Sequence, residues 1–108
     1  MNIITINGIQ FKGRSLSEIY SKVLKYLVDN GIILRGDKFL PYPTSNKRYF
    51  ISKEPIHQRG NSFRIPVEYN GYFLEGHKSW KIGLKHLDDF LKKINVGLKI
   101  NYCEYEHY

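Results

Sequence analysis

The stretch RGNSFRIPVEYNGYFLEGHKSWK, residues 59–81, decides how the rest of the chain is organised. Two strand-like runs, residues 62–69 and 72–76, flank Asn70-Gly71. An Asn-Gly pair between two such runs predicts a β-hairpin, because a type I′ turn needs positive φ at both central residues. The second run leads into residues 77–80, HKSW, which we interpret as the start of a helix.

The apolar side chains of this hairpin are expected to be structural. Alternate side chains of a strand point to opposite faces, and one face of a hairpin normally packs on a core. We therefore expect these four residues to be buried: Phe63, Ile65, Val67 and Phe73.

A second Asn-Gly pair, Asn7-Gly8, lies between residues 2–6 and 9–12 and predicts a second hairpin. Ser15 and Glu18 then form the pattern of a capping box, which marks a helix start. Apolar residues follow at helical spacing until Gly31, so we expect a helix over residues 16–30.

The remaining segments carry weaker signals. Residues 32–34 either start a short strand or fill the core, residues 35–38 are expected to form a turn, and residues 41–46 a loop with two prolines. Strands are predicted at 48–52 and 98–102, and a helix at 80–95 with Ser79 as its N-cap and Gly97 as its end.

Together these elements predict a single domain over residues 1–108, with residues 103–108 as a tail that is expected to fray. The expected fold class is α+β. It would have a largely antiparallel sheet, built from the two Asn-Gly hairpins and further strands, with two helices packed on one face.

The composition favours a polyanionic partner. The 108 residues include 17 Lys and Arg against 10 Asp and Glu, which gives a net charge of +7. Nucleic acid is the commonest partner of so basic a small domain, and an acidic protein is the alternative. Nine Tyr and six Phe exclude the disordered class, in which aromatic residues are depleted.

One cysteine, Cys103, excludes a disulfide framework and a cysteine-based zinc site. No apolar run reaches 18 residues, and the first residues lack the pattern of a signal peptide. We therefore expect a cytoplasmic protein that does not associate with membranes.

Candidate catalytic residues are few. No glycine-rich phosphate loop and no Gly-x-Ser-x-Gly motif occur, so no cofactor is expected. The histidines have no metal-pair spacing, although a zinc site from His57, His77 and a carboxylate stays open. A minimal nuclease that uses His57 and His77 as acid and base is a further alternative.

The residues around the second hairpin suit binding better than catalysis. Arg59, Arg64, Lys78 and Lys81 are expected to hold phosphates, with Tyr72, His77 and Trp80 nearer the bases. In the alternative interpretation, Trp80 covers the sheet and the lysines line the wet face of a helix. The full predicted set of nucleic-acid contacts is Arg59, Asn61, Arg64, Tyr72, His77, Lys78, Ser79, Trp80 and Lys81.

Three segments carry a resemblance to a known group of domains: RYFISKEPIH at 48–57, GNSF at 60–63 and NGYFLEGHKS at 70–79. The pattern resembles a small accessory domain of bacterial restriction and phage-defence proteins, often fused to larger nuclease or NTPase modules. The resemblance implies a DNA-directed or target-sensing role, a larger nuclease or NTPase as partner, and importance for His57, Glu75, His77 and Ser79. The chain departs from that pattern in having no attached catalytic module.

The function predicted from the sequence is a small, non-catalytic, defence-related module that binds nucleic acid, with DNA favoured. The alternative is a protein-interaction adaptor or inhibitor that binds an acidic or nucleic-acid-handling protein. The oligomeric state stays open.

Overall fold

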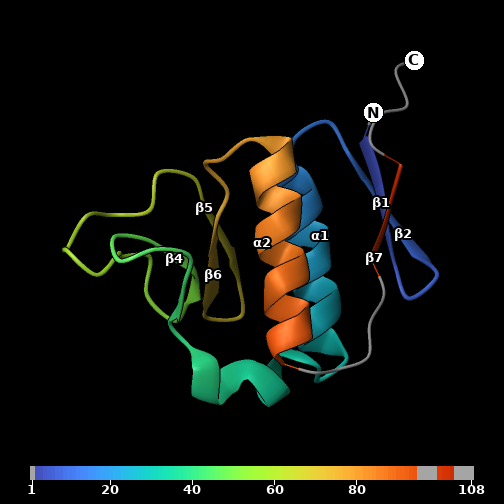
Figure 1. Cartoon of the computed structure of the whole chain (residues 1–108). Helices are drawn as coiled ribbons and strands as arrows, with labels where there is room; N and C mark the ends of the chain where they lie inside the picture. Colours follow the sequence, from blue (N-terminus) through green and yellow to red (C-terminus); the bar gives the residue numbers. More distant parts are fainter. Residues whose placement is uncertain (1, 95–99, 104–108) are drawn as a thin grey trace.

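The computed structural model of the protein describes residues 2–94 and 100–103. Two helices, α1 (Leu16–Asp29) and α2 (Trp80–Lys93), run side by side between two small antiparallel sheets (Figure 1). The α+β class is therefore confirmed. The strands nevertheless divide into two sheets with the helices between them, where the sequence predicted one sheet with the helices on one face.

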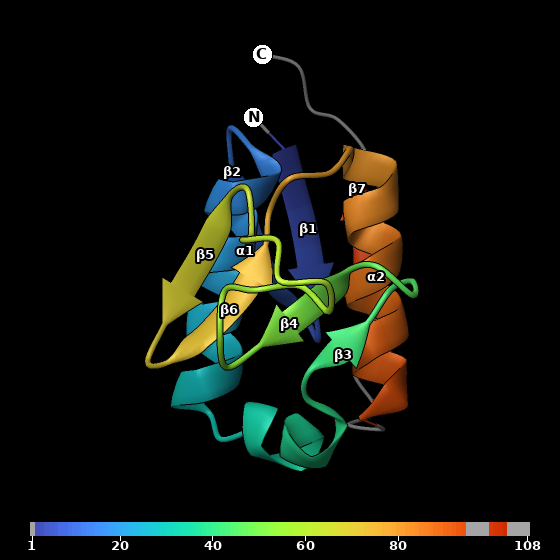
Figure 2. The ribbon, with the colours of Figure 1, turned by 90° about the vertical axis from the view of Figure 1, so that its left-hand side faces the viewer.

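The first sheet has the strand order β2-β1-β7 and the second β3-β4-β6-β5. The strands of the first sheet are β1 (Asn2–Ile6), β2 (Ile9–Gly13) and β7 (Ile100–Cys103). Those of the second are β3 (Tyr42–Pro43), β4 (Tyr49–Ser52), β5 (Pro66–Tyr69) and β6 (Tyr72–Glu75). The second sheet faces the viewer in Figure 2.

Each sheet contains one hairpin with an Asn-Gly turn. β1 pairs with β2 across Asn7 and Gly8, which have φ of 52° and 81°. β5 pairs with β6 across Asn70 and Gly71, which have φ of 53° and 83°. Positive φ at both positions is the requirement of the type I′ turn.

Both termini of α1 lie close to the positions that the sequence predicts. The Ser15 hydroxyl accepts a hydrogen bond from the Glu18 N–H at 3.2 Å, and the Glu18 carboxylate accepts one from the Arg14 N–H at 2.9 Å. Asn30 is the C-cap, and Gly31 follows with φ of 70°. These groups satisfy backbone positions that a helix end leaves open.

The helix α2 starts at its predicted N-cap, since the Ser79 hydroxyl accepts from the Ile82 N–H at 3.4 Å. Its described part ends at Lys93 with Ile94 as C-cap. The predicted end at Gly97 and the start of the last strand at residues 98–99 lie outside the described residues. Of the predicted tail, residues 103–108, Cys103 is instead the last residue of a strand, Ile100–Cys103, and residues 104–108 also lie outside the described residues.

The segment between α1 and β4 differs from the prediction. Ile33–Phe39 form a 3₁₀ helix, η1, in which Ile33 is buried, so residues 32–38 form neither a strand nor a simple turn. Tyr42 and Pro43, expected in a loop, pair with β4 at the edge of the second sheet. An edge position suits Pro43, because proline has no N–H to donate to a ladder.

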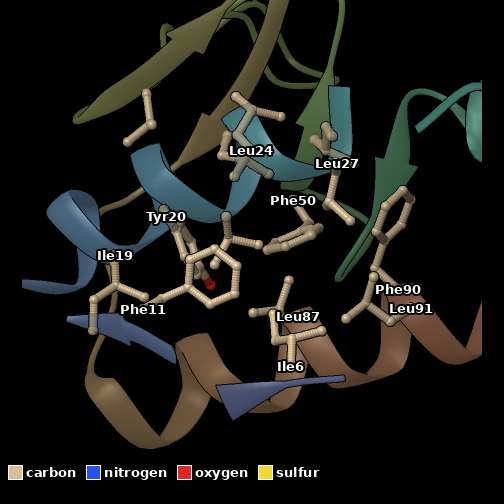
Figure 3. Close-up of a cluster of buried hydrophobic side chains, with 14 of the residues drawn as sticks. Ile6, Phe11, Ile19, Tyr20, Leu24, Leu27, Phe50, Leu87, Phe90 and Leu91 are labelled. Carbon is tan, nitrogen blue, oxygen red and sulfur yellow. The ribbon is translucent and has the colours of Figure 1, made fainter. Parts of the chain in front are cut away.

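One core lies among the helices and both sheets. Figure 3 shows Ile6 and Phe11 of the first sheet, and Phe50 of the second, converging on helical side chains. The buried residues of α1 cover an arc of roughly 140° at 100° per residue, which is wide enough to face both sheets. They are Leu16, Ile19, Tyr20, Val23, Leu24 and Leu27.

The helices approach closely at Gly83, where the Tyr20 hydroxyl donates to the Gly83 carbonyl at 2.6 Å. A Cβ at this position would collide with the Leu16 side chain. The glycine that weakens α2 by propensity therefore allows α1 and α2 to pack. Within the described ranges, no helix has the length and apolar composition that crossing a membrane requires.

Candidate nucleic-acid interface

Three segments, called the three loops below, meet at the end of the second sheet from which α2 begins: residues 44–48, 57–65 and 76–81, the last of which includes the first two residues of α2 (Figure 2). The Gln58 side-chain amide donates to the carbonyls of Ser45 at 2.9 Å and Arg48 at 3.3 Å. The Gly76 N–H donates to the Ile65 carbonyl at 2.8 Å. These bonds hold together loops that lie far apart in the sequence.

The carboxylate of Glu75, the last residue of β6, organises this region and is 3% exposed. One oxygen accepts from the N–H groups of Ile65 at 3.0 Å and His77 at 3.1 Å. The other accepts from the Arg64 N–H at 2.9 Å and lies 3.0 Å from Nε2 of His57. Four donors from two of the three loops thus converge on one buried carboxylate.

The sequence predicted a strand over residues 62–69, but β5 begins only at Pro66. The bonds to Glu75 explain why residues 62–65 are not part of it. The N–H groups of Arg64 and Ile65 point to Glu75 rather than to a neighbouring strand. Burial alone would raise the pKa of Glu75, but the three backbone donors and His57 outweigh it and lower that pKa. Glu75 is therefore a charged structural anchor.

His57 is also enclosed, at 8% exposed. Its Nδ1 accepts from the Tyr49 N–H at 2.9 Å, so Nε2 carries the proton and donates to Glu75. Its ring lies against Phe63, with centroids 4.5 Å apart. Neither ring nitrogen is available to a substrate, which argues against the nuclease that uses His57 and His77.

The same geometry bears on the zinc alternative. Among residues 2–94 and 100–103, no three His, Cys, Asp or Glu side chains are grouped so that they could hold a metal ion. Both ring nitrogens of His57 are already hydrogen-bonded.

The three loops carry most of the excess charge of the chain. They contain no Asp or Glu and six of the 17 Lys and Arg, whereas the other residues contain eleven Lys and Arg against all 10 Asp and Glu. The six are Lys47, Arg48, Arg59, Arg64, Lys78 and Lys81. We call the exposed members of this set, together with Asn61, His77 and Ser79, the basic surface.

The structure thus brings six of the nine predicted contacts together at exposed positions: Arg59, Asn61, Arg64, His77, Ser79 and Lys81. Lys78 lies just beneath them, half-buried. Lys47 and Arg48 join the surface although the sequence analysis did not include them. The signal that could have found them is their position immediately before a strand that neighbours β6.

Two predicted base contacts lie elsewhere. Tyr72 is 9% exposed, and its hydroxyl donates to Asp37 at 3.1 Å, at the opposite end of β6 from His77. Burial, with Asp37 in addition, raises the pKa of Tyr72. Trp80 is half-buried and packs against the core. Both aromatic side chains are structural rather than exposed stacking platforms.

The face of the hairpin was also misassigned. The two-residue turn places Val67 opposite Leu74 and Tyr69 opposite Tyr72. Tyr72 therefore shares the inward face with Val67, and Phe73, predicted to be buried, is half-exposed on the other face. Phe63 is buried as expected, whereas Ile65 is 42% exposed.

A cleft of about 420 Å³ opens beside the basic surface, between the loop 44–48 and α2. Arg48 and Tyr49 line one side, His77 and Lys78 another, and Ile82 and His86 the helix side. The volume lies within the range of roughly 300–1,000 Å³ that is typical of small-molecule sites.

A lysine and a histidine face each other on the wall of this cleft. The Lys78 ammonium lies 2.9 Å from Nδ1 of His86 and 5.0 Å from the ring centre of Phe50. Burial lowers the pKa of Lys78 to about 8; Glu75 opposes this effect and Arg48 adds to it. Burial, followed by the charge of Lys78, lowers the pKa of His86 to about 4, so neutral His86 accepts from Lys78.

A second cleft, of about 430 Å³, lies on the other side of Tyr49 and His57. Asp37, Lys53 and Glu54 line it, so its charges are mixed. It suits an anionic ligand less well than the cleft that contains Lys78.

No protein-family model, curated protein or solved structure matches the chain significantly, and the resemblance to restriction-associated domains therefore rests on its short motifs alone.

Proposed function

We propose that this protein binds nucleic acid, with DNA favoured, through the basic surface. The observation that carries the proposal is the concentration of six Lys and Arg, and no Asp or Glu, in three adjoining loops. Phosphate contacts by Lys and Arg supply most of the affinity of non-specific nucleic-acid binding. A defence-related role is part of this proposal and is supported by the motif resemblance only.

The anchoring of the loops supports the same function. Glu75 and Gln58 hold the backbone of the loops through hydrogen bonds, so their basic side chains start from a fixed frame. Preorganisation of this kind reduces the ordering cost of binding. Because Tyr72 and Trp80 are taken up by the core, we expect phosphate contacts to dominate and sequence preference to be weak.

The test is fluorescence anisotropy with labelled duplex and single-stranded DNA at several salt concentrations. For duplex, we expect the logarithm of affinity to fall with the logarithm of salt by about 0.9 for each neutralised phosphate. Arg59→Ala/Arg64→Ala should weaken binding. It should also make the salt dependence shallower, by the amount expected for the loss of roughly two phosphate contacts.

The matched control is Lys12→Ala/Arg35→Ala, which removes the same charge from exposed positions outside the three loops. Circular dichroism verifies the fold of both variants. An equal loss of affinity in the control would show that net charge, and not this surface, binds DNA. Absence of binding to either form at low salt would refute the proposal.

A protein-binding adaptor is the second candidate, because apolar side chains lie beside the basic loops. Ile65 and Ile82 are 42% and 49% exposed. Exposed apolar groups within a charged rim are typical of protein interfaces. This candidate predicts a complex with an acidic protein that persists at moderate salt and is broken by Ile65→Asp or Ile82→Asp.

A further inference from the structure

We infer that the cleft between the loop 44–48 and α2 binds a terminal phosphate group, carried by the end of a nucleic-acid strand or by a free nucleotide. For the first source, the inference rests on the proposed function. The geometry that points to it is a recessed lysine among further basic groups, on the wall of a nucleotide-sized opening.

The basic residues around the cleft come from three different segments. Arg48 precedes β4, and His77 and Lys78 follow β6. His86, two turns into α2, orients the Lys78 ammonium through one of its three N–H groups. The remaining N–H groups of Lys78 can donate to oxygens of a phosphate.

The one carboxylate on the wall, that of Glu75, does not prevent anion binding. Both of its oxygens are occupied by hydrogen bonds, from three backbone N–H groups and from His57. Charged Glu75 also favours the protonated form of Lys78, which is the form that binds phosphate.

The depth of Lys78 favours a terminal phosphate over an internal one. Lys78 is half-buried against Phe50, whereas Arg48 and His77 are exposed at the rim of the cleft. An internal phosphodiester has a sugar on both sides and follows the outer surface. A terminal phosphate has one free side and can enter, and it carries up to two negative charges near neutral pH.

The other walls suit the rest of a nucleotide. The Tyr49 ring and the Ile82 side chain line the same cleft, and Ile82 is 49% exposed. Aromatic and aliphatic groups of this kind pack against a sugar or a base. Basic residues and apolar side chains that line one cleft match a phosphate attached to a flatter apolar body.

A purely structural role for Lys78 makes a different prediction. Its contacts with Phe50 and His86 would stabilise the fold, and its loss would lower stability without any preference among ligands. A phosphate site predicts a ligand preference that depends on the Lys78 proton. Arg48, Glu75 and His86 are the charged or titratable groups that face this ammonium.

The experiment compares one single-stranded oligonucleotide with a 5′-phosphate, a 3′-phosphate or hydroxyl groups at both ends. We expect at least one phosphate to tighten binding about tenfold or more, because hydrogen bonds between charged groups are strong. The ratio of the affinities for the phosphorylated and the hydroxyl-ended oligonucleotide should fall from pH 7 to pH 9 as Lys78, with a pKa of about 8, loses its proton.

Lys78→Met keeps the apolar stem and should remove the preference for a terminal phosphate, whereas Lys12→Met, at an exposed position outside the three loops and the cleft, should preserve it. If Lys78→Met does not fold, exposed Arg48→Gln and the pH series replace it. Inorganic phosphate and adenosine monophosphate, followed by NMR shifts of His86, test the free source.

The outcomes separate the two proposals. Equal binding of all three oligonucleotides, together with no shift at His86 on addition of phosphate or the nucleotide, would overturn the phosphate site and leave the proposed function intact. Shifts at His86 with phosphate or the nucleotide, without any oligonucleotide binding, would support the site and refute the proposed function. If no probe binds, both are wrong.

Discussion

The two hairpins of this protein share a plan and differ at their ends. Each has an Asn-Gly turn, then a glycine, one or two basic residues, a serine N-cap and a helix. Before α1 the connection is Gly13-Arg14-Ser15, and before α2 it is residues 76–79, GHKS.

The difference lies in which carboxylate holds the connection. Before α1, Glu18 of the helix itself accepts from the Arg14 N–H, four residues away. Before α2, Glu75 of the preceding strand accepts from the His77 N–H and also from a loop 10 and 11 residues earlier. The first carboxylate completes a helix start, and the second assembles a surface.

The sharpest test of this contrast is the same substitution at both carboxylates. Glu75→Gln leaves buried N–H donors without charged acceptors, so we expect a loss of about 3 kcal/mol or more in the free energy of unfolding. Glu18→Gln changes an exposed cap and should cost about 0.5 kcal/mol. Urea unfolding followed by circular dichroism measures both.

A large loss for Glu18→Gln, or a small one for Glu75→Gln, would remove the distinction between the two connections. Amide signals of Arg64, Ile65 and His77 provide an independent readout. They should shift in Glu75→Gln and stay unchanged in Glu18→Gln.

Alanine substitution should affect the two Asn-Gly turns equally, although the two connections that precede the helices differ. Gly8 and Gly71 have φ of 81° and 83°, and a Cβ at either would meet no atom within 4 Å. The cost of alanine is then backbone strain alone, about 1 kcal/mol at each turn. We expect Gly8→Ala and Gly71→Ala to lower the free energy of unfolding, measured by urea denaturation, by equal amounts. A difference of more than about 1 kcal/mol would mean that one turn has a second role.

Protonation of His86 at acid pH should lower the free energy of unfolding by a smaller amount than these substitutions. His86 has a folded pKa of about 4 against an ordinary value of 6.5. A depressed pKa contributes stability that is fully present above pH 6.5 and is lost as the pH falls toward 4. Because His86 is half-exposed, solvent screening should hold the effect below about 1 kcal/mol.

The measurement is the urea midpoint from pH 7 to pH 5. His86→Asn, which retains an acceptor and does not take up a proton in this range, should show a shallower decline than the unmodified protein. Parallel curves for the two proteins would contradict the prediction. NMR signals of the amides near Arg14 should not respond to protonation of His86 and serve as an internal reference. No histidine hydrogen-bonds there in the described part of the chain.

Local signals in the sequence predicted the elements well. The Asn-Gly turns, the Ser15 cap and Gly31 each depend on residues within about four positions, so a short window contains the whole cause. The division into two sheets was not predictable in this way. Helical periodicity shows how wide a buried face is, but does not show which strands will cover it.

The candidate site divides in the same manner. Exposed cations such as Arg59 and Arg64 could be predicted because charged side chains rarely become fully buried. The burial of Tyr72 follows from the pairing of Val67 with Leu74, which the two-residue turn already implies. The motif resemblance singled out His57, Glu75 and His77, but their mutual contacts could not be predicted, since His57 lies 18 residues from Glu75 and this contact exists only in the folded chain.

The Glu75 anchor has a consequence for how the three loops can vary in sequence. It accepts from the backbone N–H groups of residues 64, 65 and 77, which every amino acid except proline carries. The side chains at these positions can therefore change in charge, size or shape without loss of the bonds that shape the loop. The protein combines a fixed backbone frame with replaceable exposed side chains, which makes it a suitable scaffold for libraries in which the side chains at these positions are varied.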